Sequence, residues 1–317
     1  APDWVWIKNR GLTGHHMIFD TVRGAGKVMY SNLTDAETTV SGHLTSFDSD
    51  GFTLGDNSGK GSSNGDDETY VAWNWKAGGT ASSNTDGSIT TSVSANSTTG
   101  FSIATYTGNK TSGVTIGHGL GAVPSMVIIK NRTASTDGWL AFHKDIGNTK
   151  FLYFSQTNAA LTSSQAWNNT TPDSSVVTLG NSDLVNGSGE NLVAYIFAEK
   201  KAFSKIGSYT GNGNANGTFV FTGFRPAWVM MKRTDSTNDW FIYDNTRNPF
   251  NETNLRISAN SNSAESTQTT NQIDLLANGF KCRGSAAATN ASGGTYIFMA
   301  FAESPLVNSK GVPNNAR

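Results

Sequence analysis

Cysteine and charge are both scarce in this sequence. A single cysteine, Cys282, among 317 residues excludes an internal disulfide framework and a metal site built from several thiolates. Only 15% of the residues are charged and the formal net charge is −1, so the chain lacks the basic surface of a nucleic-acid binder. It also lacks the polybasic clusters that hold proteins on anionic membranes. We therefore expect neither nucleic acid nor a membrane surface as a partner.

Long apolar runs are also absent. The longest, Ser125 to Ile129 and Tyr296 to Ala302, fall far short of the ~20 residues that a helix needs to cross a bilayer. No N-terminal segment combines positive charge with an apolar stretch, so no signal peptide is visible. These features predict a protein that does not insert into a membrane.

Small polar residues and aromatic residues dominate what the sequence does contain. Thirty-four glycines accompany abundant serine, threonine and asparagine, while aromatic residues make up 10% of the chain. Disordered chains are poor in aromatic residues, so this composition is typical of short aromatic strands separated by polar turns. Because periodic runs of helix-forming residues are scarce, we predict an all-β fold.

A threefold internal repeat is the most informative feature of the chain. Each copy opens with an apolar strand that ends in lysine and arginine, at Pro2–Arg10, Pro124–Arg132 and Pro226–Arg233. Each copy closes with a second apolar strand, at Tyr70–Ala77, Leu192–Glu199 and Tyr296–Glu303. The separation is 65 residues from Lys8 to Trp73, 65 from Lys130 to Tyr195 and 67 from Lys232 to Met299. Two independent signatures at nearly constant separation indicate three copies of one unit.

Matched strands also occur inside and ahead of these signatures. Phe19, Phe142 and Tyr243 occupy the same position in a strand that follows each opening segment. Copies two and three carry a leading strand, at Phe101–Asn109 and Ile206–Asn212, which the first copy lacks. A strand missing from a sheet leaves an unpaired edge. We hypothesise that the polypeptide is the C-terminal part of a longer chain, or that another subunit supplies the missing strand.

The period of the repeat predicts domains rather than a solenoid. At about 100–120 residues it far exceeds the 20–50 residues of solenoid repeats. Short alternating strands favour antiparallel sandwiches that bury one face of each sheet. We predict three tandem antiparallel β-sandwiches of jelly-roll or lectin-like type, at residues 1–79, 80–203 and 204–317. The polar stretch 78–100 joins the first two, either as a linker or with an edge strand at Ser88–Val93.

The residues that usually carry chemistry form no catalytic or metal-binding pattern. His15 and His16 are neighbours and would point to opposite faces of a strand, so we expect His16 to replace the tryptophan of the other copies. His118 lies in a glycine-rich turn before a strand, whereas phosphate-binding loops precede a helix. Asp66–Glu68 could bind calcium, but acidic residues in turns more often bond the local backbone. We predict no catalytic residue, metal or cofactor, and hence no enzyme.

Aromatic side chains are the best candidates for binding. Trp139 and Trp240 follow polar loops and could stack on sugar rings. The alternative is that the tryptophans build a core, as paired tryptophans on one strand face usually do, and core packing is the favoured interpretation of pairs such as Trp73 and Trp75. Trp139 and Trp240 are therefore the predicted glycan-binding residues, with core packing as the alternative.

Five longer motifs suggest a family. They are Phe19–Gly24, Tyr70–Gly79, Thr105–Asn109, Gly117–Gly121 and Gly223–Val229. Together they resemble a repeat family in structural proteins of tailed bacteriophages, many of them marine, that are often labelled tail fibre or virion proteins. The resemblance spans nearly the whole chain and implies no catalytic residues. In longer relatives the array can follow a SPRY-like or other lectin-like domain.

The repeat and the resemblance together predict a non-enzymatic virion structural protein on the surface of a bacteriophage particle. We expect a segment of a tail or head fibre that spaces or presents host-contacting surfaces and binds other virion proteins. By analogy with fibres, we expect a homotrimer. Two alternatives stay open, a receptor-binding lectin for host surface glycans and a capsid-decorating protein.

Overall fold

Antiparallel strands make up nearly all of the regular secondary structure of the described residues. The computed structural model describes residues 1–56 and 63–305, and in them it has 26 strands and three helices of four residues each. The prediction of an all-β fold is confirmed. Within these residues no helix has the length and apolar character to span a membrane.

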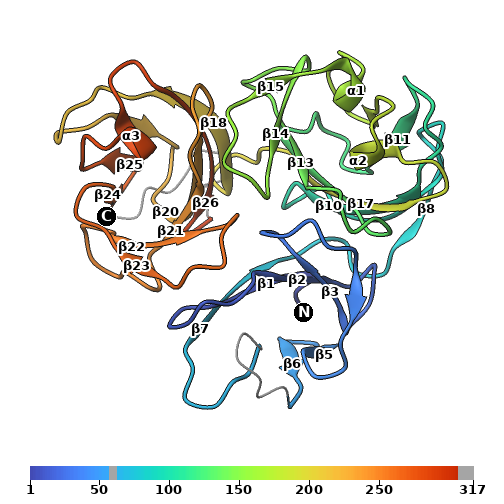
Figure 1. Cartoon of the computed structure of the whole chain (residues 1–317), viewed down its shortest axis with the longest axis horizontal. Helices are drawn as coiled ribbons and strands as arrows, with labels where there is room; N and C mark the ends of the chain where they lie inside the picture. Colours follow the sequence, from blue (N-terminus) through green and yellow to red (C-terminus); the bar gives the residue numbers. More distant parts are fainter. Residues whose placement is uncertain (57–62, 306–317) are drawn as a thin grey trace, which may run out of the picture. The chain divides into compact units, whose positions relative to one another are not determined.

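Contacts divide the chain into two compact units. Unit 1 comprises residues 1–156, 161–198 and 260–264, and unit 2 comprises 157–160, 199–259 and the described residues from 265 onward. In the colours of Figure 1, unit 1 runs mainly from blue to yellow-green and unit 2 from yellow to red. Most of the first two predicted modules therefore belongs to one unit, and most of the third to the other.

The first sheet of unit 1 has five strands, in the order β4-β3-β2-β1-β7. These are β1 (Trp4–Asn9), β2 (Met17–Asp20), β3 (Lys27–Tyr30), β4 (Thr38–Thr39) and β7 (Tyr70–Trp75). A separate hairpin is formed by β5 (Leu44–Phe47) and β6 (Phe52–Leu54). Among the described residues β7 is the last strand of this sheet, on the side where the second and third copies carry their leading strands.

The second sheet of unit 1 has eight strands, in the order β15-β14-β13-β12-β17-β10-β9-β8. In chain order they are β8 (Ser82–Asn84), β9 (Thr91–Asn96), β10 (Phe101–Thr107), β12 (Met126–Asn131), β13 (Leu140–His143), β14 (Lys150–Tyr153), β15 (Leu161–Thr162) and β17 (Asn191–Phe197). Around it lie a two-stranded sheet and two short helices, β11 (Thr115–Gly117), β16 (Val176–Thr178), α1 (Ser164–Trp167) and α2 (Asp183–Asn186). The stretch 78–100 thus contributes two strands, β8 and β9, to this sheet.

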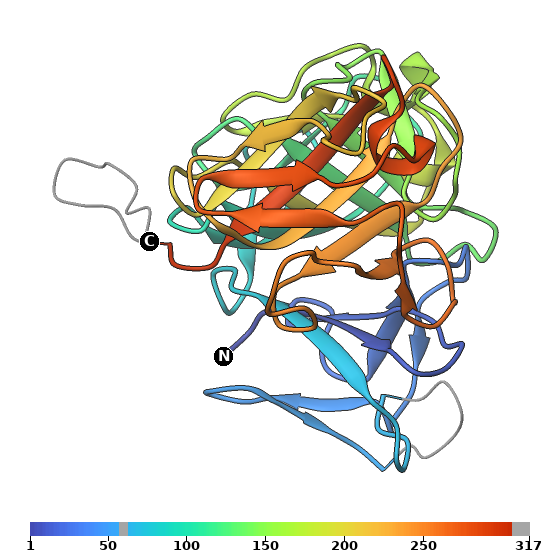
Figure 2. The same cartoon turned by 90° about the vertical axis from the view of Figure 1, so that its left-hand side faces the viewer.

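Unit 2 is built from a six-stranded and a three-stranded sheet. Figure 2 shows the larger one in gold, orange and red, with the strand order β18-β26-β20-β21-β22-β23. Its strands are β18 (Ser204–Thr210), β20 (Pro226–Arg233), β21 (Trp240–Asp244), β22 (Leu255–Ser258), β23 (Ser266–Thr267) and β26 (Thr295–Ala302). The smaller sheet has the order β19-β25-β24, and the remaining elements are β19 (Phe219–Phe221), β24 (Ile273–Leu276), β25 (Gly279–Cys282) and α3 (Ala287–Asn290).

The opening and closing strands pair in the same register in all three copies of the repeat. The three lysines lie opposite equivalent residues, in the pairs Lys8↔Val71, Lys130↔Val193 and Lys232↔Ile297. The two additional residues that separate the opening and closing strands in the third copy therefore lie before the closing strand and not within it. The neighbouring strands β2, β13 and β21 are also in a common register, which places His16 at the position of Trp139 and Trp240 as predicted.

The central strand β1 is buried on both faces. All six of its residues are buried. Val5 and Ile7 pack on one face against a cluster that includes Phe19 and Leu44. The other face, which begins with Trp4, is covered as well, so the prediction that each sheet buries a single face was wrong for this strand.

Aromatic side chains of the first two copies fill a shared interior on that second face. The ring centroid of Trp4 lies 4.7 Å from that of Trp75 and 4.9 Å from that of Tyr195. Phe101 lies at 5.6 Å from Trp4 and stacks on Phe197 at 4.7 Å. Trp75 of the first copy and Phe101 and Tyr195 of the second copy thus pack around Trp4. This shared interior explains why the first two copies form one unit.

A buried lysine ends each opening strand. Lys8, Lys130 and Lys232 are all 0% exposed. The Lys130 amine donates to the carbonyls of Asn131, Asp137 and Thr34, at 2.6, 2.8 and 3.1 Å. In unit 2 the Lys232 amine donates to the carbonyl of Thr157 at 3.0 Å. The repeated lysine is therefore a structural group that bonds backbone carbonyls.

Replacing Trp4 with alanine tests the shared interior. Trp4→Ala should lower the free energy of unfolding by about 3–5 kcal/mol, because it removes a side chain that is 1% exposed and leaves a cavity. The measurement is urea denaturation followed by far-UV circular dichroism. Leu12→Ala, at a side chain 38% exposed, is the control and should change the free energy by less than ~0.5 kcal/mol. Equal effects of the two substitutions would contradict the assignment.

Candidate binding groove

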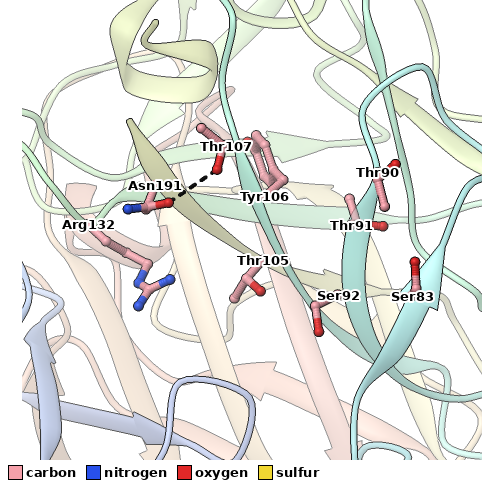
Figure 3. A pocket seen from close by; sticks show the side chains of 9 residues that line it. All are labelled: Ser83, Thr90, Thr91, Ser92, Thr105, Tyr106, Thr107, Arg132 and Asn191. Atoms are coloured by element: carbon pink, nitrogen blue, oxygen red, sulfur yellow. Dashed lines mark hydrogen bonds between the residues drawn. The ribbon is translucent and has the colours of Figure 1, made fainter. Parts of the chain in front are cut away.

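A polar groove opens on the eight-stranded sheet of unit 1. Its volume is about 340 Å³. Seven of the nine lining residues carry a hydroxyl group, and the lining consists of Ser83, Thr90, Thr91, Ser92, Thr105, Tyr106, Thr107, Arg132 and Asn191. Figure 3 shows the side chains, most of which come from β8, β9 and β10.

Strand alternation and register bring the hydroxyl groups together. Thr105 and Thr107 lie two residues apart in β10 and so share a face, while Tyr106 between them points into the core and is 5% exposed. Across the sheet, Ser92 pairs with both Ser83 and Thr105. One row of three hydroxyl groups therefore crosses three neighbouring strands, as Figure 3 shows.

An amide lies beside this row. Thr107 Oγ1 donates to Asn191 Oδ1 at 3.2 Å, the dashed line in Figure 3, and the two residues are directly opposite in the register of β10 and β17. The backbone N–H of Asn191 donates to Thr133 Oγ1 at 3.0 Å. The bond from Thr107 orients the side-chain amide, and the bond to Thr133 fixes the backbone that carries it, so the groove presents both donors and acceptors of hydrogen bonds.

The only charged residue of the lining is already neutralised by a partner. Arg132 Nε and Nη2 donate to the two carboxylate oxygens of Glu37, each at 2.9 Å. The Glu37 N–H also donates to the Arg132 carbonyl at 2.9 Å. A paired guanidinium offers little net charge to a ligand, so the groove favours neutral polar ligands over anions.

Glu37 joins Arg132 to a buried ion network. Arg23 Nη1 donates to Glu37 at 3.0 Å, and Arg23 Nε donates to Asp20 at 2.5 Å. Tyr195 completes the network with a hydroxyl that donates to Asp20 at 2.6 Å. Burial is the largest single influence on the pKa of Arg23 and would lower it, but Asp20, Tyr195 and Glu37 together outweigh burial and raise the pKa. Burial would raise the pKa of Glu37, but its bond to Arg132 and the charge of Arg23 lower it.

The groove is suited to binding through hydrogen bonds. Its lining contains no histidine, cysteine, aspartate or glutamate that could serve as a general base. Tyr106 donates its hydroxyl to the Val185 carbonyl at 2.7 Å, and burial raises the pKa of this tyrosine well above its usual value. A row of hydroxyl groups with an oriented amide matches the hydrogen-bonding pattern of a polyhydroxylated ligand.

A second cavity of about 380 Å³ lies at the other end of the sheet. It is more apolar, with Phe151 packed edge-on against Tyr153 at 5.3 Å and Leu161 38% exposed. Two serine hydroxyls in its lining, those of Ser163 and Ser182, already accept N–H groups at the starts of α1 and α2. With these polar groups occupied, this cavity is the weaker candidate for specific recognition.

The structure corrects the prediction that Trp139 and Trp240 bind glycans. Their side chains are 0% and 1% exposed. Trp139 Nε1 donates to the Tyr30 carbonyl at 3.0 Å, and its ring stacks on Tyr195 with centroids 6.2 Å apart. Stacking on a sugar needs an accessible ring face, so neither residue is a platform, and core packing is the correct interpretation.

Two of the histidines, His16 and His118, and the cysteine are structural groups. His16 Nδ1 accepts the Trp6 indole N–H at 2.9 Å, and His118 Nδ1 accepts the Leu120 N–H at 3.2 Å. Cys282 is 0% exposed, and burial raises the pKa of its thiol to about 12. None of the three is available to a ligand.

In the acidic turn at Asp66–Glu68, the glutamate has a structural role. Glu68 accepts hydrogen bonds from the Asn9 amide and from the Tyr70 hydroxyl. Across residues 1–56 and 63–305, no three histidine, cysteine, aspartate or glutamate side chains gather where they could hold a metal ion.

Sequence reasoning missed the groove because its serine and threonine residues resemble those of an ordinary polar linker or of the exposed face of a strand. Ser83 and Ser92 lie in the polar stretch 78–100, and a local signal was present there. Thr91 and Val93 are buried while Ser92 between them is exposed, which is the alternation of a half-buried strand. The exposed aromatic residues of the chain lie elsewhere, with Phe221 in unit 2 at 62% exposure.

Glu37→Gln tests the network that holds Arg132. The pKa of Glu37 is lowered in the folded state, so its contribution is fully present above its unfolded pKa and is lost as the pH falls through the folded value. At pH 7 the substitution should cost on the order of 2 kcal/mol, because it removes the charge from three hydrogen bonds, two from Arg132 and one from Arg23. Denaturation of both proteins at pH 7 and pH 3 should show the difference shrinking at pH 3. A pH-independent difference would contradict a role of the carboxylate charge.

Comparison with known proteins gives one match. A family described as "Domain of unknown function (DUF7483)" matches residues 1–305. No curated protein and no solved structure matches the chain.

Proposed function

The chain belongs to the DUF7483 family, a domain of unknown function, and from the construction of its groove we propose that it is a non-enzymatic protein that binds surface glycans. The setting we propose is a bacteriophage particle, where the chain forms a segment of a tail or head fibre and contacts other virion proteins. The single observation behind the binding role is the groove, in which a row of hydroxyl groups on Ser83, Ser92 and Thr105 lies beside one oriented amide. The virion setting rests on the resemblance of the repeat motifs to phage structural proteins.

We further propose that the chain is organised as three tandem β-sandwiches of jelly-roll or lectin-like type. Three observations support this arrangement. The opening and closing strands pair in one register three times, and each pair packs a face against hydrophobic residues. The buried lysine recurs at the end of each opening strand. A tandem array of such sandwiches would make a stiff spacer that presents the groove away from its attachment point.

The chemistry of the groove favours a neutral sugar over a charged one. Ser83, Ser92 and Thr105 can each donate and accept a hydrogen bond, as sugar hydroxyls do. Arg132 is paired with Glu37 and contributes no strong field for a carboxylate or sulfate. Shallow recognition of this kind is weak for one site and gains strength when several copies bind together.

Ser92→Arg should abolish glycan binding. Ser92 is exposed at the middle of the hydroxyl row, so a long charged side chain fills the groove without disturbing the core. Glycan-array signal and adsorption to host cells should fall at least about tenfold, which corresponds to ~1.4 kcal/mol. Ser174→Arg, at an exposed turn outside the groove, is the matched control and should bind like the wild type. Unchanged binding by the Ser92 variant would refute the groove as the site.

We propose that the protein acts as a homotrimer. Symmetric assembly would place three grooves on one trimer, so that several weak contacts act together. Native mass spectrometry should give three times the chain mass of 33.7 kDa. A dominant monomer at micromolar concentration would contradict the trimer while leaving the groove proposal testable by the Ser92 variant.

A further inference from the structure

The outer edge of β7 has no neighbouring strand among the described residues, whereas the equivalent strands of the eight-stranded and six-stranded sheets each have one. In the five-stranded sheet β7 is the terminal strand among the described residues. Its counterparts β17 and β26, which pair with the opening strands in the same register, are each covered on that side by a further strand, β10 and β18. Within residues 1–56 and 63–305, the same place in the sheet is therefore filled in two copies and open in the first.

The backbone of β7 points hydrogen-bonding groups at this open edge. In the second sheet one backbone hydrogen bond lies at each end of the pairing between β10 and β17. The Gly108 N–H donates to the Glu190 carbonyl at one end, and the Ala198 N–H donates to the Gly100 carbonyl at the other. Because backbone groups alternate along an antiparallel strand, every second residue of β17 from Glu190 onward faces β10, including Ala194 and Ile196. The common register places Ala72 and Asn74 at the positions of Ala194 and Ile196. The N–H and C=O groups of Ala72 and Asn74 therefore face the open edge.

The side chains at these positions are uncovered as well. Ala72 and Asn74 are exposed, whereas Ala194 and Ile196 are both 0% exposed. The Asn74 amide turns back and donates to the Ala72 carbonyl at 3.3 Å. This long bond gives one edge carbonyl a partner from its own strand, and an incoming strand could replace it at little cost.

The two filled positions show what an occupant of the edge looks like. Ile103 in β10 lies opposite Tyr195, and Ile206 in β18 lies opposite Met299. Three residues further along, both strands carry a tyrosine that is nearly buried, Tyr106 at 5% and Tyr209 at 8% exposure. By the common register, a strand on β7 would place its isoleucine opposite Trp73. The pattern is an isoleucine followed three residues later by a tyrosine, in a strand antiparallel to β7.

We propose that the outer edge of β7 binds one extended segment with this isoleucine–tyrosine pattern, by addition of a strand to the sheet. Main-chain hydrogen bonds to Ala72 and Asn74 would supply much of the affinity, and burial of the isoleucine and tyrosine would supply the specificity. The occupant is a free segment. β10 of a second folded copy cannot serve, because β9 and β17 already occupy both of its edges. This strand site is independent of the glycan groove.

A synthetic peptide with the sequence of Phe101–Asn109 tests the site on the full chain. Fluorescence anisotropy of the labelled peptide should show saturable binding, and hydrogen exchange at Ala72 and Asn74 should slow at least about tenfold when the peptide is bound. The control peptide carries serine in place of the isoleucine and the tyrosine, and should bind at least about tenfold more weakly. Absence of saturable binding, or equal binding of the two peptides, would overturn the proposal.

Two variants at one position locate the binding edge. Ala72→Pro removes the N–H that faces the open edge, and should weaken peptide binding at least about tenfold. Ala72→Val keeps the N–H and should bind like the wild type. If Ala72→Pro does not fold, a peptide N-methylated on its β7-facing amides takes its place, with the same expected loss.

The alternative occupant is a second β7. Two edges could pair directly, which would appear as a dimer of the wild-type chain that grows with concentration and is lost in Ala72→Pro. Such a dimer, or binding that Ala72→Pro leaves unchanged, would overturn the assignment of this edge to an isoleucine–tyrosine segment.

Discussion

A charged amine buried at the end of each opening strand constrains the rest of the structure. Removing an ammonium group from water is costly unless hydrogen-bond acceptors surround it. Lys130 meets this requirement with three carbonyls, and one of them, that of Thr34, belongs to the segment after β3. In unit 2 the carbonyl of Thr157 has the same role for Lys232. Burial lowers the pKa of Lys130 and Lys232 to about 8, although nearby carboxylates oppose the shift. The lysine therefore fixes which loop packs against the end of the strand.

The candidate groove depends on this arrangement. Arg132 follows Lys130 by two residues, and the segment that Lys130 holds at Thr34 continues to Glu37, which pairs with Arg132. Glu37 in turn reaches Arg23, so one carboxylate serves two guanidinium groups. The charged end of the groove is thus built from the first and second copies of the repeat. Arg132 is neutralised because the packing of the two copies brings Glu37 to it. A hydroxyl row beside a neutralised arginine leaves recognition to hydrogen bonds, and the proposed binding role rests on this chemistry.

The strands and the repeat could be predicted from the sequence, because both are local or periodic signals. Alternation predicts β10 and β12, and two signatures at constant spacing align Lys8 with Lys130. What lies against the second face of a strand is not encoded in its own alternation. Trp139 looked like a surface platform because it follows a polar loop, yet the carbonyl of Tyr30, more than one hundred residues earlier, accepts its indole N–H. The groove escaped prediction for the same reason, since its hydroxyl row exists only across the paired strands.

The open edge of β7 shows how one copy of a repeat differs when none of the described residues fills the strand position beside it. At the position that holds Ile196 in the second copy and Ala300 in the third, the first copy has Asn74. An apolar residue there would leave an exposed hydrophobic edge, which favours non-specific pairing between chains. Asparagine keeps the edge soluble and gives the Ala72 carbonyl a partner, while the backbone stays in the register that a further strand requires. The substitution therefore protects the edge without closing it, which is the compromise expected of a sheet that must be stable alone and still accept a strand.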